Sequence, residues 1–358
     1  MFSKALTILV LAAAALAAPT VPGELKVSVA APESMSSLDG LKVVASVTNT
    51  GTEDVTVLNI GTILDATRAT KSFKVTKDDT PVAFTGVRIY PNMGNLPESA
   101  YTTIKAGETV TVEHDVSALY DFEGALEGDF TFTPNAVLPI VTNKIAGSAP
   151  ELKIVELTDL PSAAVKLSGD LARRELPGSK NAKRATVSCS NSSRASFISQ
   201  TYAESKVLAG YARDYASSNG TSSLVKAFWK TNSASTVATR FNSVATENTS
   251  GRTLNCSDPY DICDEAVAYT VISGNNPIYF CDSYFSFPNP TSSQCGVSTT
   301  EQMSAAAVAL HESTHAVLGT DDINYGCTGD QSLSASNQLN NADNYNCFAM
   351  WVFLQTRC

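Results

Sequence analysis

In this 358-residue chain, His311, Glu312 and His315 form a pattern of side chains that can act together in a reaction. Two histidines four positions apart on a helix lie on one face and can bind one metal ion. Neutral imidazole is a good zinc ligand. Glu312, one position further round, can reach a water on that ion without binding the ion itself. The pattern therefore predicts a zinc hydrolase with two histidine ligands and a general base.

The flanking sequence predicts a helix that carries these residues. Residues 303–310 are mostly good helix formers, Ser298 with Glu301 predicts a capping box, and Gly319 follows as a stop. A chance match of the short motif on an ordinary buried helix is the alternative. The chain has three histidines, and two of them are here, which favours the metal site.

A catalytic zinc site usually has three protein ligands and one open position. The third histidine, His114, lies at the end of a distant predicted strand, where a single histidine more often has a structural role. The cysteines have another expected use, so the third ligand should be a carboxylate. Asp322 follows His315 by seven residues, inside the segment Gly-Thr-Asp-Asp-Ile-Asn-Tyr-Gly at 319–326.

His-Glu-x-x-His followed by Gly-Thr-x-Asp-x-x-Tyr-Gly resembles the aspzincins, the deuterolysin family of fungal neutral metalloproteases. The resemblance implies that Asp322 is the third zinc ligand, that Tyr325 lies beside the substrate carbonyl, and that each protease domain binds one Zn²⁺. It leaves Asp321 pointing away from the metal. It extends over the signal, pro-region and mature layout, and so over essentially the whole chain.

The first 18 residues predict a secretory signal. Lys4 supplies a positive charge, residues 6–16 are apolar, and Ala-Leu-Ala at 15–17 is a cleavage site. The apolar run is too short to span a bilayer as a mature helix, and no later run in the sequence is long enough. We therefore expect an exported, extracellular protein and no membrane partner.

Residues 19–184 predict a β-rich pro-domain with a sandwich-like fold. They contain no cysteine, and apolar and polar residues alternate in segments separated by Gly, Asn, Asp and Pro. These segments are residues 25–29, 41–47, 55–58, 72–75, 109–113 and 129–133. Residues 157–184 are polar and basic, which predicts an exposed linker. The linker ends in Lys183-Arg184, and we expect cleavage after Arg184.

All eight cysteines follow this dibasic site, which makes a domain boundary there. An even number of cysteines in a secreted chain predicts disulfides, and eight allow 105 pairings. The family resemblance implies that the first four cysteines pair with their neighbours in order. A cysteine-ligated zinc would need clustering of the C-x-x-C type, which the sequence lacks. We favour the pairs Cys189–Cys256, Cys263–Cys281, Cys295–Cys358 and Cys327–Cys347.

Residues 185–358 predict the mature protease domain. Helical patterning covers residues 195–216 and 223–244, β-like runs cover 266–272 and 277–280, and a last helix is expected at 333–354. The fold class is thus α+β: a mostly helical, zincin-like protease domain with a small sheet, preceded by the β-sandwich-like pro-domain. The edge of the small sheet could bind an extended peptide by strand addition.

The chain is acidic, with a net charge of −10, and from Ala185 onward 14 acidic residues outnumber 8 basic ones. Such a field attracts basic substrates, and the family resemblance implies a preference for basic proteins. The mature domain has no basic patch with interleaved aromatics, so we expect no nucleic-acid partner. A monomer is expected, with proteins or peptides as substrates and the pro-domain as folding aid and inhibitor.

The sequence therefore predicts a secreted zinc endopeptidase made as a preproprotein, in which Glu312 is the general base. One alternative is the lysine-specific branch of the same superfamily. A lysine pocket needs carboxylates, and Asp343 is a candidate, but Asn346 stands where that branch has an acidic residue. Another alternative is a secreted, disulfide-rich binding protein without catalysis, against which the intact Glu312 argues.

Overall fold

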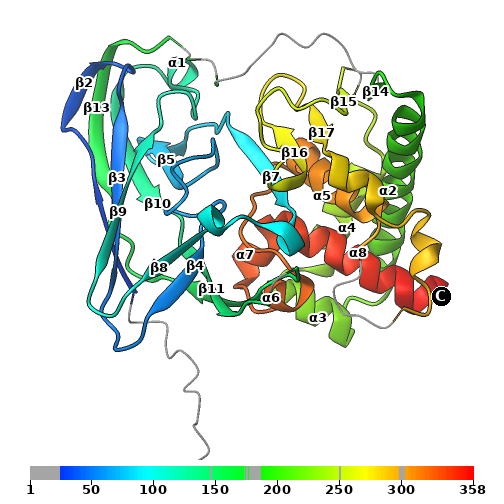
Figure 1. The fold of residues 1–358 in the computed structure, drawn as a ribbon. Coiled ribbons are helices and arrows are strands. Elements are labelled where there is room, and N and C mark those ends of the chain that lie inside the picture. The colour runs from blue at the N-terminus through cyan, green and yellow to red at the C-terminus, as the bar shows by residue number, and fades with distance from the viewer. Residues whose placement is uncertain are drawn as a thin grey trace, which may run out of the picture.

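The computed structural model describes residues 25–145, 147–172, 174, 176, 187–249, 251–297 and 303–358, which form two halves of mixed α and β content (Figure 1). We call residues 25–172 the β half and residues 187–358 the helical half. The signal segment, the dibasic site at Lys183-Arg184 and the capping box of Ser298 with Glu301 lie outside the described residues.

The β half contains three sheets in the part that the structure describes. Their strands pair antiparallel, except that β2 and β13 run parallel. In spatial order, the first sheet is β1 (Leu25–Ala30), β3 (Lys42–Asn49) and β9 (Thr109–Asp115). The second is β2 (Ser34–Ser37), β13 (Ala163–Asp170), β10 (Gly128–Pro134), β5 (Phe73–Lys77) and β6 (Thr80–Pro81), and the third is β12 (Glu151–Glu156), β11 (Val137–Asn143), β4 (Val55–Leu58) and β8 (Tyr101–Ile104). The short helices are η1 (Met93–Asn95), η2 (Glu98–Ala100) and α1 (Phe122–Ala125).

One apolar core joins these strands, because alternate side chains on each strand point inward. Phe73, Phe130 and Phe132 lie at its centre. The six predicted strands are all present, with ends shifted by at most two residues. The prediction of a linker over residues 157–184 is wrong for its first part, because β13 lies there. Val165 and Leu167 are buried in that strand, where their period-two pattern is hidden among charged neighbours.

The helical half packs its helices around one buried helix, α5. Its helices are α2 (Ser192–Ser218), α3 (Ser223–Trp229), α4 (Ala234–Ala245), α5 (Ala305–Leu318), α6 (Cys327–Asp330), α7 (Ala335–Asn340) and α8 (Ala342–Arg357). Its strands and 3-10 turns are β14 (Val187–Ser188), β15 (Leu254–Asn255), β16 (Ala266–Val271), β17 (Ile278–Phe280), η3 (Asp282–Ser286) and η4 (Thr291–Gln294).

Two of the predicted helices are each divided in two. The helix expected at 223–244 breaks at Lys230, whose φ is 44°, and restarts where the Ser233 side chain caps α4. The helix expected at 333–354 breaks at Asn341, whose side-chain oxygen accepts the backbone N–H groups of Ile323 and Asn324. In both places, local capping or a tertiary contact outweighs helix propensity.

A strand from the β half completes the sheet of the helical half. Within the described residues, this sheet has the order β14-β15-β17-β16-β7, where β7 is Val87–Pro91. β7 runs antiparallel to β16, with Ile89 opposite Tyr269. In Figure 1, β7 is the cyan strand that reaches from the β half to the helical half. This strand was not predicted from the sequence.

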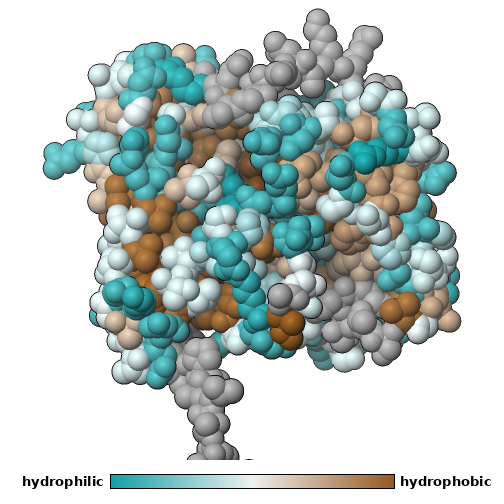
Figure 2. All heavy atoms as spheres, in the orientation of Figure 1, coloured by the Kyte–Doolittle hydropathy of each residue, from teal (hydrophilic) through white to brown (hydrophobic). Residues whose placement is uncertain are grey.

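All four expected disulfides are present, and all lie in the helical half, so the predicted pairing is confirmed. Among the described residues, none of the helices combines the length and the apolar character needed to cross a bilayer. Seen in the orientation of Figure 1, the surface mixes polar and apolar side chains, with apolar patches gathered on the β half (Figure 2).

Candidate metal centre

Helix α5 holds the two histidines rigidly in the middle of the helical half. The Ser304 side chain accepts the N–H of Ala307 and caps the start of the helix. Gly319 ends it with φ 66° and donates its N–H to the carbonyl of His315. Every residue from Ala305 to Ala316 is buried, so the helix is fixed on all sides.

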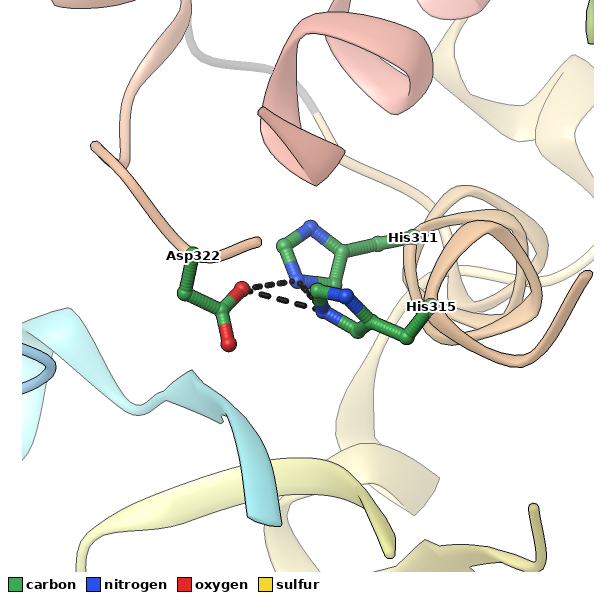
Figure 3. A group of neighbouring side chains, drawn as sticks. All are labelled: His311, His315 and Asp322. Carbon is green, nitrogen blue, oxygen red and sulfur yellow. Dashed lines mark hydrogen bonds and ion pairs between the residues drawn. The ribbon is translucent and has the colours of Figure 1, made fainter. Parts of the chain in front are cut away.

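Three potential ligand atoms meet at one point (Figure 3). Asp322 Oδ1 lies 3.0 Å from the Nε2 atoms of both His311 and His315. The two Nε2 atoms are 3.1 Å apart. The helix supplies the two imidazoles, and the segment after Gly319 returns the chain so that the Asp322 carboxylate faces them. The structure thus brings together the three predicted metal ligands.

The partner of each Nδ1 atom determines which ring nitrogen carries the proton and which one turns a lone pair toward the centre. His315 Nδ1 lies 2.9 Å from the carbonyl oxygen of Thr320, an acceptor that requires the proton on Nδ1. His311 Nδ1 faces the carboxylate of Asp343 at 3.4 Å. Both Nε2 lone pairs are then directed at Asp322 Oδ1, and only a cation or a proton relieves the repulsion. This donor set of two imidazoles and one carboxylate fits a catalytic zinc ion.

The charges at the centre agree with a cation site. Burial lowers the pKa of His311, but hydrogen bonds to Asp322 and Asp343 outweigh burial and raise it to about 10. For Asp322, burial acts to raise the pKa, but the two histidines outweigh it and hold the pKa well below its usual value. The surroundings of the three ligand atoms therefore favour a positive charge between them.

Glu312 lies beside this point and is fully buried. Its Oε2 accepts a hydrogen bond of 2.6 Å from the Thr270 hydroxyl on β16. Its Oε1 has no hydrogen-bond partner among the described residues. Burial raises the pKa of Glu312 to about 8, so the group can exchange a proton near neutral pH. The Thr270 contact fixes the carboxylate and leaves one oxygen for a reactant.

The two adjacent aspartates point in different directions. Asp322 faces the histidines, whereas the Asp321 carboxylate accepts from Asn340, Lys71 and Arg88. The main chain of Asp321 is held by its own half, because its N–H donates to the Asn340 carbonyl at 2.8 Å and its carbonyl accepts from Ala342 at 2.9 Å.

Strand β7 enters the site through its main chain. The N–H of Ile89 donates to Asp322 Oδ2 at 2.9 Å, and the Ile89 carbonyl accepts from the Tyr325 hydroxyl at 2.8 Å. The ring of Tyr90 stands edge-on to that of His311, with centroids 4.7 Å apart. The site therefore binds both the N–H and the carbonyl of one extended residue, Ile89.

The chain is similar to known proteins along nearly its whole length. The model of the deuterolysin metalloprotease (M35) family matches residues 2–356. The chain belongs to this family. It is 33% identical over 362 residues to a neutral protease 2 homolog from Aspergillus terreus, covering 98% of each chain. It is also 33% identical to a neutral protease 2 homolog from Neosartorya fischeri over 88% of this chain and 86% of the relative, and 30% identical to penicillolysin from Penicillium citrinum over 88% and 89%.

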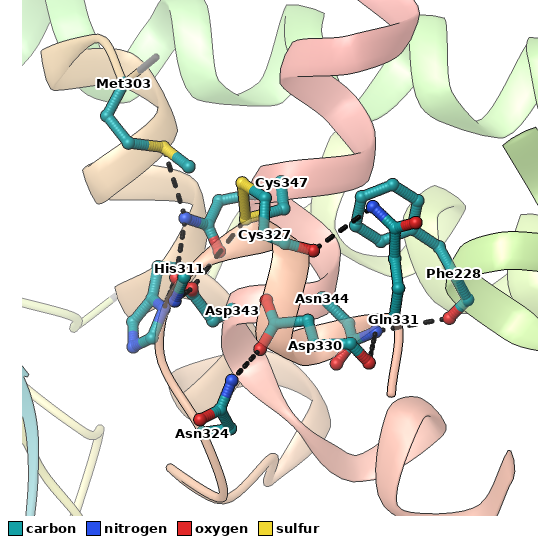
Figure 4. The surroundings of a disulfide bond; sticks show 12 residues. Phe228, Met303, His311, Asn324, Cys327, Asp330, Gln331, Asp343, Asn344 and Cys347 are labelled. Atoms are coloured by element: carbon teal, nitrogen blue, oxygen red, sulfur yellow. Dashed lines mark hydrogen bonds and ion pairs between the residues drawn. A yellow bond between two sulfur atoms is a disulfide. The ribbon is translucent and has the colours of Figure 1, made fainter. Parts of the chain in front are cut away.

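This deuterolysin-family chain is thus a metalloendopeptidase. Asp343, the residue expected to line a substrate pocket, does not lie in an open pocket. Asp343 is 2% exposed, and its Oδ2 accepts the N–H of Gly326 at 2.7 Å. The Cys327–Cys347 disulfide joins α6 to α8 immediately beside it (Figure 4). Asp343 lies between this disulfide and the histidine, because its Oδ2 contacts Cys347 Sγ and its Oδ1 faces His311 Nδ1 at 3.4 Å.

The remaining histidine and several supporting residues complete the description of the deuterolysin site. His114 Nε2 contacts the Ile63 carbonyl at 2.9 Å inside the β half, as expected of a structural histidine. Three residues that orient Glu312, His315 and the Asp322 segment were not predicted from the sequence: Thr270, Thr320 and Asn341. Thr320 lies inside the second motif and could have been found there, whereas only the folded chain brings Thr270 and Asn341 to the site.

Proposed function

We propose that this chain is the precursor of a secreted, zinc-dependent endopeptidase. In this proposal residues 1–18 are the signal, residues 19–184 a sandwich-like pro-domain, and residues 185–358 a mostly helical, zincin-like protease domain. The observation that carries the proposal is the convergence of two imidazole nitrogens and one carboxylate oxygen beside a buried glutamate with a free oxygen. That constellation is what metal-assisted hydrolysis of an amide bond requires.

His311, His315 and Asp322 would hold one Zn²⁺. When bound, the ion polarises the peptide carbonyl and lowers the pKa of the attacking water. Glu312 accepts the proton of that water at Oε1, while the Thr270 hydroxyl keeps Oε2 in place. The raised pKa of Glu312 suits a group that must take a proton and then release it to the leaving amine.

Tyr325 would donate a hydrogen bond to the substrate carbonyl as negative charge develops there. Its hydroxyl makes such a bond to the carbonyl of Ile89, which supports this role. The substrate would add as a strand to the edge of β16, in the way that β7 does. Hydrogen bonds along β16 give affinity for any extended peptide, and the fixed Tyr325 hydroxyl sets which carbonyl reacts.

The pro-domain would keep the enzyme latent by occupying this edge. β7 pairs with β16, and Ile89 uses both Asp322 Oδ2 and the Tyr325 hydroxyl. The contacts of β7 with the metal centre are through main chain and the Tyr90 ring, and His114 lies inside the β half. Inhibition is therefore steric, and cleavage after Arg184 followed by loss of the β half would open the edge.

The buried state of Asp343 supports a general endopeptidase over the lysine-specific branch. Its Oδ1 accepts from Asn346 at 2.9 Å, and its Oδ2 is taken by Gly326. A pocket for lysine would need a carboxylate free to meet the ammonium group. A preference for basic proteins follows instead from the acidic net charge of residues 185–358.

The proposal is tested on the secreted chain expressed at full length. N-terminal sequencing of the processed protein should give Ala185-Thr186, and casein cleavage should stop on chelation and return on adding Zn²⁺. Metal analysis should find one zinc per chain. Hydrolysis that survives complete metal removal, or an active form that retains the β half, would contradict the proposal.

A further inference from the structure

Asp321 is the carboxylate next to the metal ligand Asp322, and its neutralising cations come from the other half of the molecule. Its side chain forms ion pairs with Lys71 and Arg88 of the β half. The donor from the helical half is the neutral amide of Asn340, at 2.8 Å. Removal of the β half therefore takes away two cations and leaves an anion beside the metal centre.

The main chain that carries this carboxylate is held by the helical half. Asp321 is fixed by main-chain hydrogen bonds to Asn340 and Ala342, both in the helical half. The adjacent Thr320 carbonyl is fixed as well, because it accepts from His315 Nδ1. A preformed pair of acceptors, one charged and one neutral, therefore remains when the β half leaves.

Arg88 shows what this pair of acceptors binds. Its Nε donates to the Thr320 carbonyl at 3.2 Å, and its Nη2 donates to Asp321 Oδ1. Arg88 is 5% exposed, and its guanidinium carbon lies over the Phe84 ring, 4.4 Å from the ring centroid. A planar cation with parallel donors matches such a site better than any neutral side chain.

The residue order along β7 fixes where the cation lies relative to the reacting bond. Ile89 carries the carbonyl that the Tyr325 hydroxyl binds, and Arg88 precedes it. Successive side chains of a strand point to opposite faces, so the Arg88 side chain and the Ile89 side chain leave the strand in different directions. In a peptide bound as β7 is, the residue at the Asp321 site is the second one before the cleaved bond.

We propose that Asp321 and the Thr320 carbonyl form a substrate subsite for an arginine or lysine side chain at the second position on the amino-terminal side of the cleaved bond. This inference rests on the proposed function. In the precursor, Arg88 fills the subsite in the manner of a substrate. In the precursor, a cavity of about 440 Å³ borders Asp321 and is lined also by Lys71 and Asn340.

A subsite predicts a more specific preference than attraction by net charge does. A general field raises the rate for every basic substrate, wherever its charges lie. A subsite raises the rate for one position only, because the guanidinium must reach Asp321 while the following carbonyl reaches Tyr325. A charge moved by one residue along a strand points to the opposite face and loses the contact.

The first experiment uses the secreted, naturally processed enzyme and a mixed peptide library, with cleavage sites read by mass spectrometry. Arginine and lysine should be enriched at the second residue before the cut and at no other position to the same degree. Cleavage without that enrichment overturns the subsite while leaving the proposed function intact. Absence of metal-dependent cleavage would instead remove the proposed function.

The second experiment compares Asp321→Asn with Glu265→Gln, both expressed as the full chain. Glu265 is a matched control, because it is a carboxylate of the helical half that also pairs with a β-half cation, Arg68. The readout is the ratio of kcat/KM for two peptides that differ by Arg or Gln at the predicted position. Asp321→Asn should lower this ratio by roughly tenfold to a hundredfold, the loss of one charge-assisted hydrogen bond, and Glu265→Gln should keep it.

Equal losses in the two variants, or an unchanged ratio in Asp321→Asn, would overturn the proposal. Bound zinc is measured in each preparation, so a variant with a damaged centre is recognised. The variant Asp321→Glu separates loss of charge from other damage, because it keeps the charge. It should retain most of the kcat/KM ratio between the Arg and Gln peptides. Should both Asp321 variants lose zinc, the enrichment measured with the peptide library on the wild-type enzyme decides between support and rejection.

Discussion

The β half and the helical half of this chain are stabilised by different means. The β half has a large apolar core with a smaller apolar cluster, and the sequence has no cysteine before Cys189. The helical half has four disulfides, and many of its buried side chains are polar, among them the metal-centre residues. Burying polar groups costs free energy unless each is paired, and covalent cross-links offset part of that cost.

The two halves differ in this way because they have different tasks. In the proposed maturation, the β half serves only until processing, and an apolar core is enough for that purpose. The helical half must keep a polar site in place outside the cell. In the ion pairs described between the halves, the cations Arg68, Lys71 and Arg88 come from the β half, and the anions Glu265 and Asp321 come from the helical half. Four predictions test this contrast.

Replacing Glu312 by Gln gives the largest expected effect. The amide keeps the shape of the side chain but does not take the proton of the attacking water, so we expect kcat to fall by roughly a thousandfold or more. Bound zinc should stay close to one per chain. Casein hydrolysis and metal analysis on the processed enzyme measure both quantities.

Glu113→Gln is the matched change in the β half, where Glu113 is an exposed partner of Lys42. The processed enzyme from this precursor should have wild-type turnover. Near-normal turnover of Glu312→Gln at full zinc occupancy would instead remove Glu312 from the mechanism and break the assignment of chemistry to the helical half.

Asp322→Ala should lose zinc and activity together, because it removes one of three ligands. Asp321→Ala should retain zinc, since Asp321 faces away from the two histidines. Metal content of the two purified variants is the measurement. Zinc lost from Asp321→Ala and kept by Asp322→Ala would make Asp321 the ligand and contradict the geometry.

The sequence predicted the local features of this site and missed the long-range ones. Four-residue spacing on a helix placed His311 and His315, and the second motif placed Asp322. Six strands of the β half were found because their alternation is regular. Strand β7 was missed, since Val-Arg-Ile-Tyr-Pro is short and its pairing with β16 links residues that are far apart in the chain. Helix breaks at Lys230 and Asn341 were missed because capping and tertiary contacts decide them.

Loss of the Cys327–Cys347 disulfide, through alanine at both positions, should destabilise only the helical half. The bond closes a loop of 20 residues, and such a loop contributes about 3 kcal/mol. Urea unfolding of the precursor, followed by tryptophan fluorescence, reports this half, because both tryptophans, Trp229 and Trp351, lie in it. Circular dichroism of the β-sheet signal reports the unfolding of the β half. An equal shift in both transitions would show that the halves unfold as one unit and would break the contrast.

The smallest expected effect is an acid-dependent loss of stability in the helical half through Glu247. Burial raises the pKa of Glu247, but hydrogen bonds from Tyr202 and Lys206 and the charge of Arg252 outweigh it and lower the pKa from 4.5 to about 2. A depressed pKa stabilises the fold fully above the unfolded value near 4.5, and this contribution is lost as pH falls toward 2. At about 1.36 kcal/mol per pKa unit this lowering corresponds to about 3 kcal/mol, and solvent screening at this partly buried carboxylate reduces the contribution to roughly 2 kcal/mol.

The measurement is the urea midpoint of the helical half between pH 7 and pH 2, for the wild type and Glu247→Gln. The difference between them should be constant above pH 5 and shrink between pH 4.5 and 2. The carboxylate of Asp170 in the β half also has a lowered pKa, through the Ala172 N–H and Arg174, but its side chain is 60% exposed. Water screens such a pair, so Asp170→Asn should leave the β-half midpoint close to wild type throughout. A pH-independent difference for Glu247→Gln would mean that this carboxylate acts through shape rather than charge.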